Sequence, residues 1–256
     1  METKSDDAKE QLLALLCRGE DPWVWGGDAH NCRVRFERNG IGGLNCGENQ
    51  RSWISSEFNW VLLTEPVRAD TGIWTFTIEM TLTTRFSSEY HETNHWFKGA
   101  ALQDYLQKPP PPSEAPFSWA PLYSAAFLPK QFTLTLSRGT FIEPFHEFVK
   151  PPYPLFQRYR FAPTRYSYKI SFDKSPYPPP EEWDKSFENN VLGASMNYHR
   201  YWEMKDFVWG RKDKTWAQTL DLGWWLSPSV GDGYWRGRER HPIWDEYFAF
   251  LGKSKK

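Results

Sequence analysis

The stretch Ile73–Thr83, with the sequence IWTFTIEMTLT, alternates large apolar side chains with threonine or glutamate. Successive side chains of a β-strand point to opposite faces, whereas a helix would scatter the same side chains around its axis. The pattern therefore predicts a strand with a buried face that carries Trp74 and Phe76 and a polar face that carries Glu79. A strand of this kind is typical of an antiparallel sheet with one face in the core.

The sequence before this strand predicts partners for it. Residues 33–37 alternate in the same way, and Asn39–Gly40 is the favoured dipeptide of a type I′ turn, so we expect a hairpin with residues 41–46. Trp60 lies on the apolar face of the next predicted strand, residues 57–62. A hairpin followed at once by a third strand indicates antiparallel order.

The sequence after Ile73–Thr83 continues the pattern. Residues 132–137 and 166–172 both alternate apolar with polar side chains, and Arg138–Gly139 predicts a turn into a further strand at 140–145. Few long helical patterns separate these strands, so parallel crossovers are not expected. The fold class that follows is mainly β, an antiparallel sandwich or closed barrel.

Helical patterns are few. The leucine spacing within residues 5–17 predicts a short amphipathic N-terminal helix, and residues 91–107 predict a second helix that ends before the prolines of 109–112. In the last third of the chain the periods are mixed, and only residues 243–251 suggest a closing helix. No repeat or linker divides the sequence, so we expect one domain, residues 1–256.

Charge and composition exclude several classes of protein. Lys and Arg number 31 and Asp and Glu number 32, which gives a net charge of -1 and no general attraction to phosphate backbones. We therefore expect no nucleic-acid partner. No stretch approaches the roughly 20 apolar residues of a membrane span, and the polar start METKSDDAKE lacks a signal-peptide pattern. We expect a soluble cytoplasmic protein with no membrane partner.

The three cysteines, Cys17, Cys32 and Cys46, contain no CxxC pair. In a reducing compartment this arrangement is typical of free thiols. No family-type catalytic signature surrounds any of them, and no G-x-S-x-G nucleophile motif occurs. A covalent hydrolase is therefore not supported.

One segment matches a metal-binding pattern. His91-Glu92-Thr93-Asn94-His95 has the HExxH spacing, in which a helix places two histidines on a zinc ion and the glutamate activates water. The Thr-Asn spacer resembles a helix start, and no further histidine completes a metzincin pattern. We expect capping or surface histidines here, with a zinc metallopeptidase as an alternative.

Three glycines, Gly40, Gly42 and Gly43, raise the question of a phosphate-binding loop. No helix follows them, and both the dinucleotide-binding and the P-loop spacings are broken. We interpret them as turn and bulge glycines. We expect no cofactor and no required metal.

The aromatic content is the unusual feature: 15 Trp, 12 Tyr and 18 Phe among 256 residues. Such rings either fill a solid core or line a cavity for one apolar ligand, as a barrel of about eight strands allows. Glu79 faces either solvent or the interior, where burial would make it an acid or base. From the strand faces we predict Glu79 and Tyr168 as catalytic residues. The predicted ligand-binding residues are Trp60, Trp74, Phe76, Tyr166 and Trp202.

Four stretches carry a resemblance to a known group of proteins. Residues 35–43 (RFERNGIGG), 53–54 (WI), 57–60 (EFNW) and 175–179 (SPYPP) resemble small fungal proteins with lipocalin-like barrels. The resemblance implies a lipocalin-like barrel and a place in natural-product biosynthesis, where such proteins act without cofactor as cyclases or pericyclases. We expect a cofactor-independent cyclase or isomerase that holds a hydrophobic intermediate. The alternative is a hydrophobic-ligand carrier without catalysis.

Overall fold

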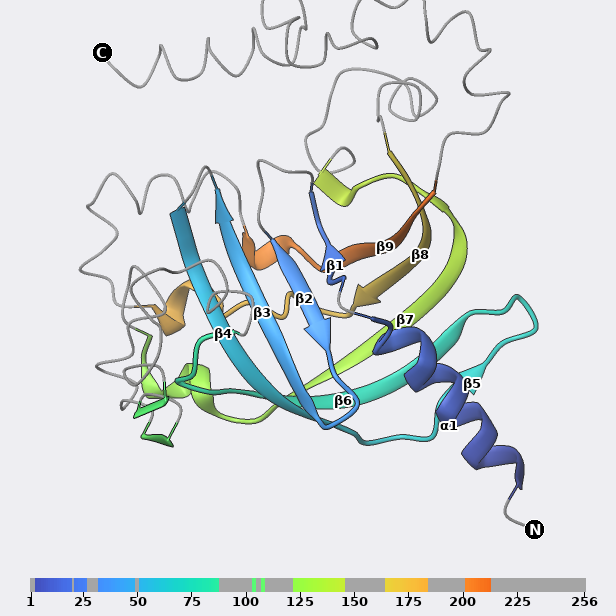
Figure 1. Cartoon of the computed structure of the whole chain (residues 1–256), viewed down its shortest axis with the longest axis horizontal. Coiled ribbons are helices and arrows are strands. Elements are labelled where there is room, and N and C mark those ends of the chain that lie inside the picture. Colours follow the sequence, from blue (N-terminus) through green and yellow to red (C-terminus); the bar gives the residue numbers. More distant parts are fainter. Residues whose placement is uncertain are drawn as a thin grey trace, which may run out of the picture.

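The computed structural model describes residues 3–19, 21–26, 32–48, 51–87, 103–104, 107–108, 122–145, 164–183 and 201–212. In these ranges the fold is mainly antiparallel β with one N-terminal α-helix (Figure 1). The predicted fold class is confirmed at this level. The elements are α1 (Thr3–Leu16), β1 (Trp23–Val24), β2 (Arg33–Phe36), β3 (Ile41–Glu48), β4 (Arg51–Leu62), β5 (Val67–Arg68), β6 (Trp74–Leu82), β7 (Lys130–Phe141), β8 (Arg165–Phe172) and β9 (Asp206–Lys212).

The strands form a closed ring. Their order is β4-β3-β2-β1-β9-β8-β7-β6-β5, and every pair of neighbours is antiparallel. Strand β4 also pairs with β6, from Phe58 opposite Leu82 to Leu62 opposite Ile78. This pairing joins the two ends of the order, so eight strands close on themselves and the two-residue β5 extends β6 beyond them.

Strand β6 has the alternation that the sequence predicts. In β6 the even-numbered residues from Trp74 to Leu82 are buried, and the residues between them are exposed or half-buried. The predicted hairpin is also confirmed, since β2 pairs with β3 across Asn39–Gly40 and Gly40 has a φ of 82°. A positive φ is a conformation that glycine adopts at little cost.

Gly42 serves a different purpose from Gly40. Gly42 lies in β3, opposite Phe36 of β2. A Cβ atom on Gly42 would lie 2.2 Å from the Phe58 ring and 2.4 Å from the Arg35 carbonyl oxygen. Only glycine leaves room for that ring. The interpretation of these glycines as structural residues agrees with this packing.

The turn predicted at Arg138–Gly139 is wrong. Strand β7 runs through both residues to Phe141, and the irregularity appears instead as a register shift against β8 between Arg138 and Phe141. A bulge lets the long strand bend without leaving the sheet. The chain turns only after Phe141, so no separate strand occupies 140–145.

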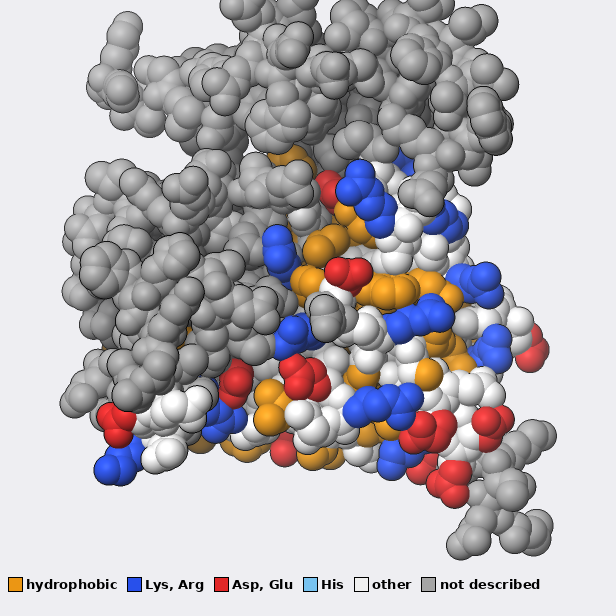
Figure 2. Space-filling model, viewed as in Figure 1, with side chains coloured by type: hydrophobic (Ala, Val, Ile, Leu, Met, Phe, Trp, Pro, Cys, Tyr) orange, Lys and Arg blue, Asp and Glu red, His pale blue; other side chains and the backbone are white. Residues whose placement is uncertain are grey.

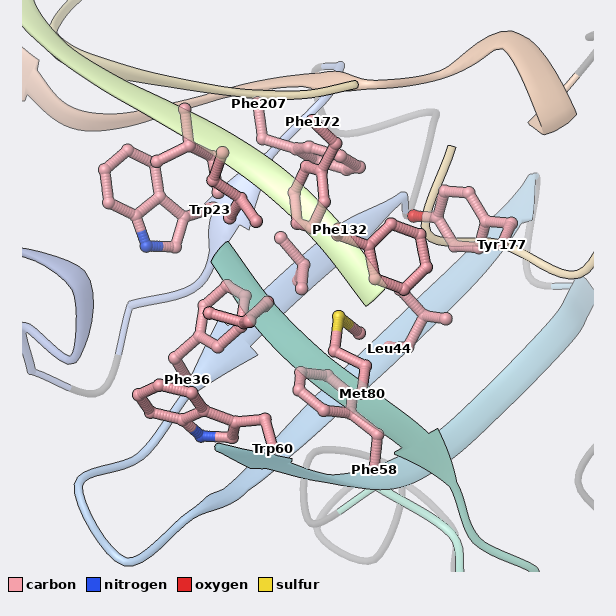
Figure 3. Packing of buried hydrophobic residues seen from close by; sticks show 14 of the residues in the cluster. Trp23, Phe36, Leu44, Phe58, Trp60, Met80, Phe132, Phe172, Tyr177 and Phe207 are labelled. Atoms are coloured by element: carbon pink, nitrogen blue, oxygen red, sulfur yellow. The ribbon is translucent and has the colours of Figure 1, made fainter. Parts of the chain in front are cut away.

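Buried aromatic rings from several strands meet inside the ring (Figure 3). Phe36 of β2 stacks on Phe172 of β8 with 6.5 Å between centroids, although two strands separate β2 from β8 in the sheet order. Phe172 also contacts Phe132 and Phe207 edge-on. These contacts cross the interior, so side chains of the protein fill this level of the ring.

Helix α1 packs against the ring through its leucines. Leu12 and Leu16 are fully buried in the core cluster, and Arg38, in the β2–β3 turn, forms an ion pair with Glu10 at 2.8 Å. The predicted amphipathic helix is confirmed and covers the core near that turn. The predicted helix at 91–107 lies almost wholly outside the described residues, and the one at 243–251 lies entirely outside them.

Candidate functional site

A buried acid lies against one of the predicted site residues. The hydroxyl of Tyr166 donates a 2.8 Å hydrogen bond to Glu143 Oε1, and Glu143 is only 7% exposed. Tyr166 of β8 pairs with Phe141 at the end of β7, and Glu143 follows two residues later. The end of β7 therefore places Glu143 beside Tyr166 of β8. A carboxyl group and a phenol at this distance form a pair through which a proton can pass.

Two half-buried aromatic rings continue the same face of the sheet. Tyr168 lies two residues after Tyr166, about 6.6 Å further along β8, and both share the face that buries Ile170. Tyr168 pairs with Trp209 of β9, and their rings lie 5.8 Å apart. Both rings pack against the core yet are not fully buried. Part of each residue is therefore exposed to solvent.

Arg18 places a cation over these rings. Its guanidinium carbon lies 5.3 Å from the Trp209 ring centroid and 5.8 Å from that of Tyr168, and its Nη1 donates a 3.4 Å hydrogen bond to the Tyr168 hydroxyl. A cation over an aromatic face is attracted by the ring quadrupole. We call Arg18, Glu143, Tyr166, Tyr168 and Trp209 the β8–β9 site.

The segment that carries Arg18 is held at two points. Trp23 Nε1 donates to the Leu16 carbonyl at 3.0 Å, which anchors the end of α1 to β1. Trp209 Nε1 donates to the Asp21 carbonyl at 3.2 Å. These two bonds bracket Arg18 along the chain, so its place over the rings follows from the fold.

Two further arginines flank the site. Arg138 of β7 pairs with Tyr168, and Arg211 of β9 pairs with Tyr166, so each projects on the face that its tyrosine shares. Both side chains are exposed, and within the described part of the chain neither forms an ion pair. Figure 2 shows Lys and Arg side chains interleaved with apolar and acidic ones on this face of the molecule. Three arginines, Arg18, Arg138 and Arg211, thus lie at or beside the site against one acid within it, Glu143, and this balance favours an anionic group.

Three predicted ligand-binding residues lie inside the core. Trp60, Trp74 and Phe76 are 5%, 4% and 1% exposed. The indole N–H of Trp60 is shared between the carbonyls of Glu37 and Ile41, both at 3.2 Å, and the Trp60 ring contacts Phe36 edge-on. These contacts give Trp60 a packing role in the β2–β3 turn. The structure does not bring the three residues to the β8–β9 site.

Of the two orientations considered for Glu79, the structure shows the outward one. Glu79 is half-buried on the face of β6 opposite Phe76 and Ile78. The sheet therefore separates it from the core rings. Trp202 lies in a short 3-10 helix before β9 and packs against the core while remaining partly exposed. Of the predicted site residues, the structure brings together Tyr166 and Tyr168.

The site residues that sequence reasoning missed are Glu143, Arg18 and Trp209. Glu143 stands among prolines and aromatic residues with no periodic pattern, and Arg18 follows a helix as an ordinary surface residue would. Trp209 belongs to a strand in which Phe207 and Val208 are both buried, and adjacent buried residues hide the alternation. Its aromatic character was the one signal that could have pointed to it.

The residues of the predicted HExxH pattern, His91, Glu92 and His95 among them, are not among those that the structure describes. Within the described ranges, no group of three or more His, Cys, Asp or Glu side chains is arranged to hold a metal ion. The same ranges contain no helix with the length and apolar character that a membrane crossing requires.

Comparison with known proteins gives no relative for this chain. It matches no protein family, no curated protein and no solved structure.

Proposed function

We propose that this protein binds an apolar small molecule with an acidic group at the β8–β9 site. The observation that carries the proposal is the placement of Arg18 over the half-buried rings of Tyr168 and Trp209. Aromatic rings give a ligand an apolar surface, and a guanidinium gives a carboxylate a charge-assisted hydrogen bond. Exposed Arg138 and Arg211 beside the site add positive charge on the same face.

The packing of the interior supports this position for the ligand. Phe36 and Phe172 stack across the ring, and Tyr177 contacts Phe207 and donates a hydrogen bond from its hydroxyl to the Asn45 carbonyl at 2.8 Å. A ligand at that level would have to displace these rings. The half-buried tyrosine and tryptophan of the β8–β9 site can receive one with smaller rearrangement.

The proposal includes a lipocalin-like barrel. Its support is the closed ring of eight antiparallel strands with an N-terminal helix packed on the core. Proteins of that shape hold single small ligands in or at the mouth of the ring.

The test is a titration followed by tryptophan fluorescence. Oleate and its methyl ester serve as matched probes, because they share the same acyl chain and the ester replaces the charged carboxylate with a neutral group. We expect saturable quenching by oleate and binding of the ester weaker by about 10-fold or more, since a hydrogen bond to a charged group contributes about 1.5–3 kcal/mol.

Variants connect the binding to the site. Arg18→Gln should weaken oleate binding by about 10-fold and leave the affinity for the ester nearly unchanged. Arg68→Gln is the matched control, because Arg68 also lies over an aromatic ring, that of Trp74 at 5.3 Å, but on β5. Equal affinities for acid and ester, or equal effects of the two variants, would contradict the proposal.

A second candidate function is a cofactor-independent isomerase or cyclase. The hydrogen-bonded pair of Glu143 and Tyr166 favours it, because a buried acid and a phenol beside a ligand site can move a proton from one substrate carbon to another. Tyr168 would hold the substrate against Trp209. No step in this chemistry needs a cofactor, since a proton transfer within the substrate leaves its atoms and electrons balanced.

This second candidate is tested with a polycyclic β,γ-unsaturated ketone. Its isomerisation to the conjugated ketone is a pure proton shift that ultraviolet absorbance follows directly. We expect a rate above that of buffer, lowered by about 100-fold or more in Glu143→Gln because general acid–base catalysis typically contributes 10²–10⁴-fold. A rate equal to that of buffer would contradict the isomerase function and would not affect the proposed binding function.

A further inference from the structure

Two cysteine thiols lie in direct contact inside the ring. Cys32, immediately before β2, and Cys46, in β3, have their Sγ atoms 2.9 Å apart. Both residues are 1% exposed and belong to the core cluster. A disulfide bond measures about 2.05 Å, so the two sulfur atoms need to approach by roughly 0.9 Å to bond.

The register of the hairpin explains the contact. Arg33 pairs with Asn45, so the preceding residue, Cys32, comes opposite Cys46 on the adjacent strand. The Cys32 carbonyl accepts a 3.0 Å hydrogen bond from the Trp25 N–H on the β1 side and is therefore directed away from β3. Cys32 and Cys46 thus form a non-hydrogen-bonded pair.

This type of pair has suitable backbone geometry for a disulfide. Non-hydrogen-bonded residues of antiparallel strands have Cα atoms about 4.5 Å apart, and disulfides span about 4.4–6.8 Å between Cα atoms. The bond can therefore form with side-chain rotation and little movement of the backbone. The third cysteine, Cys17, directly follows α1 and lies outside this strand pair.

We propose that Cys32 and Cys46 are a redox-sensitive site that forms a cross-strand disulfide when a peroxide oxidises the protein. With hydrogen peroxide, one thiol attacks the peroxide and becomes a sulfenic acid with release of one water. The second thiol then displaces the hydroxyl of that sulfenic acid as a second water. The two thiols lose two electrons and two protons, and the peroxide is reduced.

The disulfide would join β2 to β3 near the part of the ring where strand pairing is shortest. Strand β1 has two residues and pairs with β9 at a single position, Val24 opposite Val208. The Trp25–Cys32 hydrogen bond continues the attachment of β1 to β2 just beyond the strand. Oxidation would therefore fix β2 to β3 where β1 is attached. This site is independent of the proposed ligand-binding function.

The experiment is peptide mapping of the intact, folded chain. The protein is incubated with hydrogen peroxide, unfolded in the presence of iodoacetamide, and digested with trypsin without reduction. The sequence places each cysteine in its own tryptic peptide, residues 10–18, 19–33 and 39–51. We expect a linked pair of peptides 19–33 and 39–51, lighter than their sum by two hydrogen atoms, with peptide 10–18 alkylated.

Two controls sharpen the result. Cys17→Ser should leave the linked pair unchanged, whereas oxidation of the protein unfolded in guanidinium chloride should link all three cysteines in mixed combinations. The map of the wild-type protein decides the matter, so the test does not depend on whether a variant of Cys32 or Cys46 folds. The proposal is overturned if peptides 19–33 and 39–51 stay alkylated or become sulfinic acids while a small dithiol in the same tube is fully oxidised.

Discussion

The hydrogen bond from Tyr166 joins a predicted binding residue to a buried acid, Glu143. We expect Tyr166→Phe to lower the free energy of unfolding by about 1–3 kcal/mol, because the buried Glu143 loses the hydrogen bond that the Tyr166 hydroxyl donates. Urea titration measures the change. Tyr123→Phe is the control: Tyr123 is 43% exposed, and its variant should differ from wild type by less than about 0.5 kcal/mol. Equal losses in the two variants would show that the Tyr166 hydroxyl contributes no stability.

The thiol of Cys17 supplies a pH-dependent signal. Burial raises its pKa from the ordinary 9.0 to about 11, with Arg38 lowering the value and Glu37 raising it by smaller amounts. The folded chain thus holds the proton more tightly than the unfolded chain. The resulting stability is present below pH 9 and is lost as the pH rises to about 11. We expect the rate of Cys17 alkylation by iodoacetamide to reach its midpoint near pH 11, and a midpoint near pH 9 would contradict this.

Among single residues, the sequence predicts those whose role depends on the local backbone conformation. Gly40 was identifiable from the Asn39–Gly40 dipeptide because the turn itself requires a positive φ. The need for glycine at 42 depends on the ring of Phe58, which arrives from another strand. The role of Glu143 depends on Tyr166, 23 residues away, in the same manner. Contacts between distant segments leave no local pattern.

The strands differ in how clearly their sequences predict them. Strand β6 is half-buried on a regular pleat, so its alternation was complete in the sequence. Strand β7 keeps alternating up to Arg138, and its bulge was mistaken for a turn because glycine is common in both. Strand β9 buries Phe207 and Val208 side by side and was missed. Alternation of apolar and polar residues therefore identifies a strand only where the strand is regularly pleated and buries one face.

Helix α1 allows a direct test of its contribution to the core. Leu12 is fully buried, and we expect Leu12→Ala to lower the free energy of unfolding by about 2–5 kcal/mol through lost burial and the cavity it leaves. The neighbouring exposed Gln11 forms a hydrogen bond to Asp7 one turn earlier, so Gln11→Ala should cost about 0.2–0.5 kcal/mol. Guanidinium titration of both variants measures the difference, and a loss below about 1 kcal/mol for Leu12→Ala would mean that α1 is not part of the folded core.

At the scale of the whole molecule, closure of the ring was beyond sequence analysis. It depends on β4 meeting β6 and on two-residue β1 bridging β2 and β9. Neither pairing has a signal of its own, since β1 is too short for a period and β4 would look the same in an open sandwich. The sequence therefore allowed both a sandwich and a barrel, and only the pairing of distant strands separates them.

The closed ring makes the cysteine pair a test of the fold as a unit. In the chain-entropy account, a disulfide from Cys32 to Cys46 closes a loop of about 15 residues and stabilises the folded state by about 3 kcal/mol. For a protein of this size each kcal/mol raises the Tm by about 2–4 °C, so full oxidation should raise it by roughly 6–12 °C. Circular dichroism and tryptophan fluorescence should report the same shift, because the strands are joined all round and the rings of the core link β2 to β8. Cys32→Ser treated with the same peroxide should show no shift. A linked peptide pair without a change in Tm would contradict this prediction. It would mean either that the β2–β3 hairpin is already formed in the unfolded chain or that the disulfide strains the folded hairpin. In both cases the disulfide would add no stability to the ring.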